Sequence, residues 1–286
     1  MQGTKSPTFP KQHQQKQPGS EARMNPQPQY DNPDYKSAGK MVGKKAVITG
    51  GDSGIGRAVA LIFAKEGADV AILYLNEHKD AQDAAREIQA LGRKCEVISV
   101  DLKGEDAAKW AVGEAVQKMG GLDVIVNNAG VQYPQNSIED ITKEQLIHTF
   151  ESNFFSYFYV TKAALPHLRE GAAIINTASV TAFEGNPRLI DYSSTKGAIV
   201  SFTRSMALSL VARQIRVNAV APGPVWTPLI VSSFSAEEVG TFGSTTPMER
   251  AAQPCELAPV YVYLATSDST NVTGQIFNIN GGTIVN

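Results

Sequence analysis

The sequence predicts an α/β fold, namely a single-domain, Rossmann-type, doubly wound parallel sheet of about seven strands flanked by helices. Short runs of β-branched and other apolar residues alternate along the chain with longer stretches of helical periodicity. The short runs are continuously apolar, which is typical of strands buried on both faces of a parallel sheet. Regular alternation of strands and helices with short loops favours one doubly wound domain.

The predicted elements follow one another in a regular order. The predicted strands are 45–50, 69–75, 94–100, 122–128, 172–179, 214–223 and 275–281. The predicted helices are one that ends at Lys65, then 81–91, a stretch around Trp110, a long helix after Thr142, about 191–212 and 256–266. Each helix separates two strands, so we expect parallel pairing through crossover connections.

Composition and charge exclude several classes of function. The 286 residues carry 26 Lys and Arg against 28 Asp and Glu, a formal charge of −2, which provides no basic surface for nucleic acid or an acidic membrane. No apolar run approaches the roughly 18 residues of a membrane-spanning helix. The first 20 residues lack the apolar stretch of a secretory signal. Cys95 and Cys255 are far apart and the four histidines are scattered, so we expect no disulfide framework and no metal site, and a cytoplasmic location.

Composition changes abruptly near residue 40. Residues 1–40 contain six of the 15 prolines, seven glutamines and only seven apolar residues. A segment so poor in apolar groups is not expected to offset its own ordering entropy. We therefore predict a disordered or loosely docked tail over 1–40 and one folded domain over 41–286. Residues 1–20 are expected to be mobile, and about 25–40 to lie on the oligomer surface away from the catalytic edge, with Tyr30 and Tyr35 as anchors on a neighbouring subunit.

A glycine-rich turn, TGGDSGIG at 49–56, joins the first strand to the first helix. Glycines at such a turn let the backbone approach a pyrophosphate, which binds to the unpaired N–H groups of a helix N-terminus. The spacing differs from the general Gly-x-Gly-x-x-Gly dinucleotide motif, and no Gly-Lys-Ser/Thr follows as in a Walker A loop. The turn alone is therefore weak evidence for a nucleotide.

Several polar residues are predicted to converge on one edge of the sheet. Tyr192 and Lys196 stand four residues apart in a predicted helix, so both side chains point to the same side, although such pairs are common by chance. Ser179 closes the fifth strand and Asn128 the fourth, at the carboxyl edge where ligands of such sheets bind. Asn153 lies in a very aromatic helix, where its amide needs a partner, and a purely structural hydrogen bond is the alternative interpretation.

Together these motifs resemble those of the short-chain dehydrogenase/reductase family. The resemblance spans about residues 41–286, and its Pro/Gln-rich extension is similar to that of the bacterial general-stress-type branch, as is the replacement of VNGG by INGG at 279–282. The motifs, in the order that the family has them, are TGGDSGIG (49–56), Asp101, NNAG (127–130), Asn153, Ser179, YSSTK (192–196) and PGPVWT (222–227).

The resemblance implies an NAD(P)-dependent oxidoreductase that transfers a hydride between nicotinamide and a small alcohol, aldehyde or ketone. Tyr192 would be the general acid/base, and Ser179 would hold the substrate oxygen. Lys196 would bind the nicotinamide ribose, and Asn153 would anchor a water chain that relays protons. A free phenol has a pKa of about 10, and we expect Lys196 and the positive oxidised nicotinamide to lower it by about three units, which takes roughly 4 kcal/mol.

The same resemblance implies contacts with the cofactor. Gly50, Ser53, Gly54, Ile55 and Gly56 would border the pyrophosphate and a ribose, Asp101 and Leu102 the adenine, and Asn128, Ala129 and Gly130 the adjoining ribose. The remaining contacts would come from Tyr74, Tyr192, Lys196, Pro222, Gly223, Val225 and Thr227.

The choice between NAD and NADP depends on a few positions. Tyr74 takes the place of the Asp that binds the ribose 2′-hydroxyl in NAD-specific members. Ser53 and Leu75 stand where NADP-specific members carry a basic residue. Asp52 and Glu77 would repel a 2′-phosphate, whereas His78 and Lys79 would attract one. We favour NAD over NADP.

The substrate and the assembly are predicted in outline only. Residues 228–254 are expected to form a mobile lid, and a partly apolar pocket is expected from Tyr133, Val180, Phe183, Leu189 and Trp226, which would equally suit the core. Apolar residues around much of 154–168 and 195–210 predict helix pairing into a homodimer or homotetramer. Two alternatives remain: a catalytically idle dinucleotide-binding sensor or scaffold, and a sugar-nucleotide epimerase or dehydratase, for which residues 223–286 are a short substrate domain.

Overall fold

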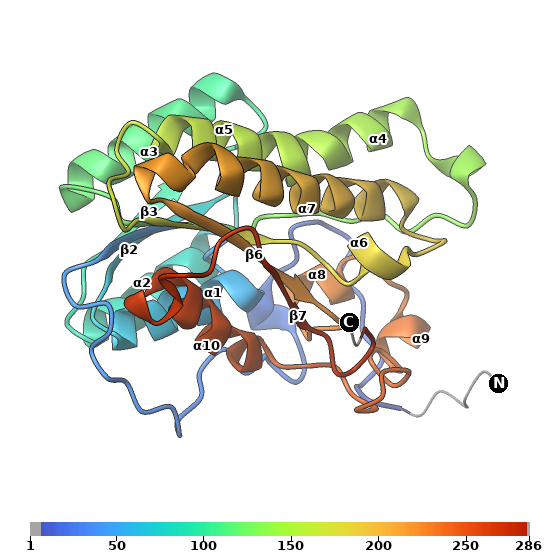
Figure 1. The fold of residues 1–286 in the computed structure, drawn as a ribbon. Coiled ribbons are helices and arrows are strands. Elements are labelled where there is room, and N and C mark those ends of the chain that lie inside the picture. The colour runs from blue at the N-terminus through green and yellow to red at the C-terminus, as the bar shows by residue number, and fades with distance from the viewer. Residues whose placement is uncertain (1–6, 285–286) are drawn as a thin grey trace.

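A seven-stranded parallel sheet forms the centre of the protein, as a computed structural model that describes residues 7–284 shows (Figure 1). The strand order is β3-β2-β1-β4-β5-β6-β7, and each neighbouring pair is parallel. The predicted fold class is therefore confirmed. The strands are β1 (Lys45–Thr49), β2 (Asp69–Tyr74), β3 (Cys95–Ser99), β4 (Val124–Asn127), β5 (Ala173–Thr177), β6 (Arg216–Pro222) and β7 (Ile276–Ile279).

Helices cover both faces of the sheet, which explains the continuous apolar runs in the sequence. Ala46 and Ile48 of β1 pack in one core with α1, α2 and α10, whereas Val47 points into a second core with α3, α5 and α7. Figure 1 shows these two layers below and above the sheet. The helices are α1 (Gly54–Lys65), α2 (His78–Ala90), α3 (Glu105–Met119), α4 (Lys143–Phe150), α5 (Ser156–Ala164), α6 (Thr181–Glu184), α7 (Ile190–Leu210), α8 (Pro228–Val231), α9 (Ala236–Val239) and α10 (Pro254–Ala265).

The strand order reverses direction between β1 and β4. From β1 the chain builds outward through β2 and β3, and it then returns to the other side of β1 and builds outward from β4 to β7. The loops after β1 and β4 therefore diverge and leave a crevice at the carboxyl edge of the sheet. In open α/β sheets this switch point is where ligands bind.

The predicted long helix after Thr142 is interrupted by a π-helical turn. This turn (Glu151–Phe155) lies between α4 and α5 and contains Asn153. The extra residue of a π turn alters the direction of the side chains that follow, and such turns frequently occur at functional sites. A hydrophobic period alone does not distinguish this turn from a regular helix.

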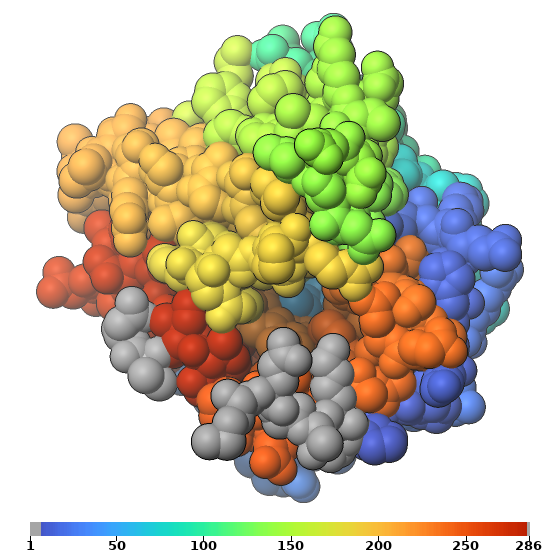
Figure 2. All heavy atoms as spheres, turned by 90° about the vertical axis from the view of Figure 1, so that its right-hand side faces the viewer, coloured from blue at the N-terminus to red at the C-terminus, as the bar shows by residue number. Residues whose placement is uncertain are grey.

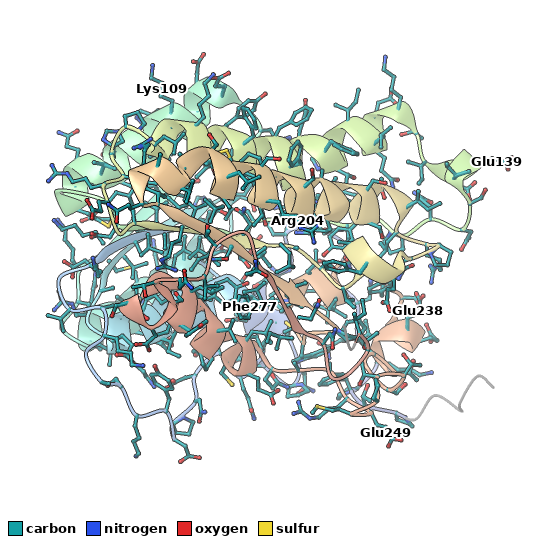
Figure 3. All side chains as sticks on the ribbon, viewed as in Figure 1. Lys109, Glu139, Arg204, Glu238, Glu249 and Phe277 are labelled. Carbon is teal, nitrogen blue, oxygen red and sulfur yellow. The ribbon has the colours of Figure 1, made fainter. Side chains whose placement is uncertain are left out.

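Residues 224–253 connect β6 to α10 and carry the short helices α8 and α9. Ser235 and Glu238 form a capping box at the start of α9, and Glu238, which Figure 3 labels, is also paired with Arg188, which precedes α7. Trp226, near the start of this segment, is fully buried. The segment predicted to be a lid thus stands beside the carboxyl edge of β6.

The N-terminal segment follows the surface of the domain. Residues 7–40 lie against the domain of the same chain, and Phe9 stacks on Trp226 with 3.7 Å between ring centroids. Arg57 lies 3.9 Å above the centre of the Tyr30 ring. Tyr30 and Tyr35 thus contact residues of their own chain in this structure, Tyr35 through a hydrogen bond to Glu66. Residues 1–6 lie outside the described part, and the mobility expected for residues 1–20 and the contacts expected with a neighbouring subunit stay predictions.

Three further findings concern only residues 7–284. No helix there is long and apolar enough to cross a membrane. No group of three or more His, Cys, Asp or Glu side chains in this range has an arrangement that would hold a metal ion. Cys95 and Cys255 are both free thiols.

Candidate active site

A cleft of about 610 Å³ opens at the carboxyl edge of the sheet. Figure 2, which looks onto this edge, shows a hollow between the yellow residues that precede and begin α7 and the orange residues of the segment after β6. Of the predicted site residues, those that line the cleft are Gly50, Ser53, Gly54, Ile55, Tyr74, Asp101, Leu102, Asn128, Ala129, Gly130, Ser179, Tyr192, Lys196, Pro222, Gly223, Val225 and Thr227. Gly56 and Asn153 stand behind the lining.

The glycine-rich turn begins α1 at the inner end of the cleft. A Cβ at Gly56 would lie 1.9 Å from the carbonyl oxygen of Gly50, so only glycine allows the helix to pack this closely on the turn. Ser53 precedes α1 without capping it through its side chain. The first-turn N–H groups that the helix itself cannot bond are therefore suited to an anionic ligand, with one exception: the N–H of Gly54 donates to Glu21 at 2.8 Å.

Thr49 and Asn128 tie the ends of β1 and β4 together. The hydroxyl of Thr49 accepts hydrogen bonds from the backbone N–H groups of Asn128, at 2.8 Å, and Ala129, at 3.0 Å. The side-chain amide of Asn128 donates to the carbonyl oxygens of Thr49 and Gly50, each at 3.2 Å. The Asn128 side chain thus holds the crevice together, which is a structural function in addition to the ribose contact predicted from the sequence.

Asn153 makes three hydrogen bonds from a fully buried position. Its Oδ1 accepts from the N–H of Val131 at 2.8 Å, and its Nδ2 donates to the carbonyl oxygen of Val131 at 2.9 Å and to the hydroxyl of Thr195 at 3.2 Å. The π turn therefore fixes the loop after β4 to helix α7. The alternative interpretation of Asn153, a structural hydrogen bond to nearby backbone, describes these contacts.

Tyr192 and Lys196 lie one turn apart in α7, with the Lys196 Nζ 5.4 Å from the centre of the Tyr192 ring. Lys196 Nζ donates to the carbonyl oxygen of Thr177 at 2.9 Å. Ser179, just beyond the end of β5, shares a hydrogen bond with Tyr192. A phenol, a hydroxyl and an amine therefore meet at one wall of the cleft.

Burial shifts the pKa values of both titrating groups at this wall. It raises the pKa of Tyr192 to about 12, and the hydrogen bond with Ser179 opposes only part of this effect. It lowers the pKa of Lys196 to about 7. Burial is therefore the dominant effect on both groups in this structure, and the lowering of the Tyr192 pKa expected from Lys196 together with the positive oxidised nicotinamide stays a prediction for the cofactor-bound protein.

Helix α7 is held in place by residues that the sequence analysis did not identify. The Asp191 carboxylate accepts hydrogen bonds from the Thr149 hydroxyl at 2.8 Å and from the Gln145 side chain at 3.0 Å, and both donors lie in α4. These contacts fix the backbone next to Tyr192. The sequence analysis did not identify the carbonyl oxygen of Thr177 either, because a backbone acceptor has no sequence signal. Three further residues that line the cleft, Pro18, Gly19 and Gln132, were also not predicted.

The part of the cleft between the glycine-rich turn and the end of β2 contains acidic and paired groups. Burial, with Asp80 and Glu77 nearby, raises the pKa of Asp52 to about 7. The Tyr74 hydroxyl is bonded to His78 Nδ1 at 2.9 Å, and Lys79 is paired with Asp83 at 3.1 Å. The basic residues near the end of β2 are therefore engaged with neighbours.

The predicted substrate-pocket residues are only partly brought together. Val180 and Leu189 line the cleft, whereas Tyr133, Phe183 and Trp226 do not. Tyr133 bonds His148, Phe183 is exposed, and Trp226 is buried under Phe9. The segment after β6 supplies apolar lining residues that were not predicted, namely Leu229, Ile230, Phe234 and Phe242.

Comparison with known proteins identifies close relatives. A family model described as enoyl-(acyl carrier protein) reductase matches residues 50–283. The uncharacterized oxidoreductase YhxC of Bacillus subtilis is 58% identical over 286 residues, 100% of both chains. General stress protein 39 of the same organism is 54% identical over 97% of both chains. Glucose and ribitol dehydrogenase of Daucus carota is 50% identical over 97% of this chain and 98% of its own.

Solved structures give the same result. A short-chain dehydrogenase from Burkholderia cenocepacia in complex with NADP superimposes with a TM-score of 0.80 at 31% identity, over 85% of this chain and 98% of its own. A 3-ketoacyl-(acyl-carrier-protein) reductase from Brucella melitensis, complexed with NADH, has a TM-score of 0.78 at 31% identity, over 86% and 100%. The chain therefore belongs to the short-chain dehydrogenase/reductase family.

Replacing Asn153 tests the link between the π turn and the cleft. Asn153→Ala removes three hydrogen bonds and leaves both backbone groups of Val131 without this partner, so we expect a loss of roughly 2–4 kcal/mol in the free energy of unfolding. Chemical denaturation measures it. Asn271→Ala, at an exposed position, is the control. A loss of less than about 0.5 kcal/mol, the range of ordinary surface substitutions, would show that these bonds do not hold the loop.

Proposed function

We propose that this protein is an NAD(P)-dependent oxidoreductase that transfers a hydride between nicotinamide and a small alcohol, aldehyde or ketone, with Tyr192 as the general acid/base. The observation that carries the proposal is the convergence of Tyr192, Ser179 and Lys196 on the cleft that also contains the glycine-rich turn. Family membership supports the reaction class. A catalytically idle sensor or scaffold is disfavoured because the set of Asn153, Ser179, Tyr192 and Lys196 is complete.

The cleft fits a dinucleotide on chemical grounds. It lies at the switch point of the sheet, and one end contains the N-terminus of α1, which favours an anionic pyrophosphate. The closely packed glycines leave the backbone of the turn accessible. The bound dinucleotide would supply or accept the hydride at C4 of its nicotinamide.

Tyr192 and Ser179 would hold the substrate oxygen between them. With a pKa of about 12, Tyr192 is a neutral phenol at neutral pH and can donate its proton to a carbonyl oxygen as the carbonyl carbon receives the hydride. Alcohol oxidation requires the phenolate instead, which accepts the hydroxyl proton. Lys196 would stabilise that phenolate and bind the nicotinamide ribose, while the Thr177 carbonyl fixes the position of the amine. Asn153 would support the water chain behind Lys196.

We favour NAD over NADP because of the charges around the expected adenosine end of the cleft. Asp52 is buried in the cleft with a pKa of about 7, and the fraction of it that is ionised at neutral pH would repel a 2′-phosphate. Within residues 7–284 the cleft lining contains no arginine, and its Lys103 is paired with Asp101 at 3.2 Å. Similar solved structures contain NADP, NADPH or NADH. The affinities of this protein for NADH and NADPH therefore have to be compared by direct measurement.

The cleft also suggests the substrate class. Val180, Leu189 and the phenylalanines of the segment after β6 provide apolar surface, and Thr181, Asn186 and Thr246 provide hydroxyl and amide groups. This mixture suits a small partly apolar carbonyl compound or a polyol. The carrot relative is named a glucose and ribitol dehydrogenase, which favours including polyols among the substrates tested.

The two free thiols, Cys95 and Cys255, are consistent with a cytoplasmic location.

Titration with NADH and NADPH, followed by a carbonyl and polyol panel, tests the proposal together with Tyr192→Phe. Only the titrating oxygen is lost in this variant, and acid/base catalysis typically contributes roughly 10²–10⁴-fold to the rate. We therefore expect turnover to fall at least about 100-fold, and the affinity for the cofactor to stay nearly unchanged. The matched control is Tyr263→Phe, because the ring of Tyr263 packs on Phe277, which Figure 3 labels. Retention of more than about a tenth of the wild-type rate would exclude the assigned role.

Lys196→Ala should behave differently from Tyr192→Phe. Because Lys196 is assigned both a ribose contact and phenolate stabilisation, we expect its loss to lower the turnover rate and to raise the dissociation constant of the dinucleotide. Lys109→Ala in α3, an exposed lysine, is the control (Figure 3). An unchanged cofactor dissociation constant, measured by fluorescence titration, would contradict the ribose contact.

We also propose a homodimer or homotetramer formed through α5 and α7. Large apolar side chains are exposed along these helices, with Phe158 45% and Leu208 79% accessible. Burying them in a symmetric interface would remove an exposed apolar patch from water. We expect light scattering at micromolar concentration to give two or four times the chain mass of 30.7 kDa, and Phe158→Glu to reduce it, with Val42→Glu as control. A monomeric wild-type protein would refute the assembly.

A further inference from the structure

Residues 14–21 form a closed turn beside the cleft. The side-chain amide of Gln14 bonds both backbone groups of Ser20: its oxygen accepts from the N–H at 2.8 Å, and its nitrogen donates to the carbonyl oxygen at 2.9 Å. The N–H of Gln14 also donates to the carbonyl oxygen of Val231 in α8 at 2.7 Å. The turn is thus closed on itself and attached to the segment after β6, and it presents residues 17–19 at its tip.

This turn bridges the two sides of the crevice at the switch point. On one side, the Gln17 side chain donates to the carbonyl oxygen of Gln132 at 2.6 Å and accepts from its N–H at 3.2 Å, in the loop after β4. On the other side, the buried carboxylate of Glu21 accepts from the N–H of Gly54 at 2.8 Å and from Arg57 at 2.6 Å, at the start of α1. Residues 17–21 therefore connect the loops that follow β4 and β1.

The bridging residues belong to the wall of the cleft. Pro18 and Gly19 line it together with the glycine-rich turn, Asn128 and Tyr192. Gly19 is buried, and a Cβ at this position would lie 2.7 Å from the carbonyl oxygen of Pro228 and 3.1 Å from the Cβ of Ser232. The wall is therefore packed against α8 without room for a larger residue.

A buried donor next to this wall has no partner within the protein. Gln132 is 4% exposed and lines the cleft, and its Nε2 makes no hydrogen bond with the residues that the structure describes. An unmet buried donor costs roughly 1–3 kcal/mol. Such a group is explained when a ligand in the cleft accepts its hydrogen bond. The contact between Gln17 and the backbone of Gln132 fixes the residue that carries this donor.

We propose that Pro18 and Gly19 are the outer wall of the dinucleotide crevice, with Gln17 and Glu21 as the positioning residues that fasten this wall to its two sides. The inference rests on the proposed function, because it assigns the dinucleotide to the crevice. It places part of the cofactor site in the N-terminal segment, outside the residues 50–283 that match the family model. The dinucleotide then enters and leaves by displacement of residues 17–19.

Stopped-flow binding of NADH and NADPH to the full-length protein tests the inference. Gln17→Ala removes the two hydrogen bonds that hold the wall to the backbone of Gln132, without altering the glycine-rich turn. We expect both the association and the dissociation rate constants of the preferred dinucleotide to rise at least fivefold, because the wall obstructs entry and exit alike. A residue that only stabilises the fold would lower the melting temperature and leave the association rate constant unchanged.

Gly19→Ala displaces the wall by a different means. Its added methyl group conflicts with Pro228 and Ser232, so we expect the same rise in both rate constants. The matched controls are Gln12→Ala, which loses a contact with Asn25 away from the cleft, and Gly113→Ala in α3, where an added Cβ meets no atom within 4 Å. Circular dichroism and melting temperature establish that each variant is folded.

Each outcome bears on a distinct claim. Faster association and dissociation in Gln17→Ala and Gly19→Ala, with wild-type rates in both controls, supports the wall. Wild-type rate constants in Gln17→Ala and Gly19→Ala, or a rise in dissociation alone, overturns it while the proposed function stands. If the wild-type protein binds neither NADH nor NADPH, the proposed function itself fails, and the wall fails with it.

Discussion

The arrangement of the cleft depends on how the ends of β1 and β4 are joined. These strands are neighbours in space but are separated by β2 and β3 in the chain, so the loops after them leave in different directions. The Thr49 hydroxyl and the Asn128 amide hold the two ends together at the point where backbone pairing stops. Because this tie uses partly buried hydrogen bonds, its loss would leave backbone groups unsatisfied and would allow the crevice to widen. The positions of the glycine-rich turn and of the Asn153 contacts follow from it.

Burial then determines the chemistry at the catalytic wall. A dry environment raises the pKa of Tyr192 and lowers that of Lys196, so both groups favour their neutral forms. This state suits proton donation to a carbonyl, whereas alcohol oxidation requires positive charge close to the phenolate. A low-dielectric site strengthens the attraction between the phenolate and a positive charge, such as that of a bound oxidised nicotinamide. The same burial that opposes ionisation therefore makes the proposed phenolate sensitive to the bound cofactor.

Sequence patterns predicted the sheet and a set of site residues of which most line the cleft, because both have local signatures. Continuous apolar runs identified the strands, and motifs at a strand end and in a helix identified residues such as Ser179 and Tyr192. The direction of the pKa shift of Tyr192 was not predictable, since it depends on how completely α7 and β5 exclude water from one side chain. The Thr177 carbonyl and the Asp191 contacts were missed because they depend on backbone position and on the packing of α4 against α7. Trp226, expected in the pocket, is instead covered by Phe9.

The N-terminal segment shows why average composition is a poor guide to docking. A segment with seven apolar residues in 40 cannot form its own core, yet several of its residues make specific contacts with the domain. Phe9 stacks on the Trp226 ring, Glu21 accepts a hydrogen bond from the first residue of α1, and Gln17 bonds the backbone of Gln132. The glutamines that make the segment look disordered supply paired donors and acceptors to backbone groups, as Gln14 and Gln17 do. Polar residues thus order this segment at the edge of the cleft, where an apolar segment would bury the groups that a dinucleotide must reach.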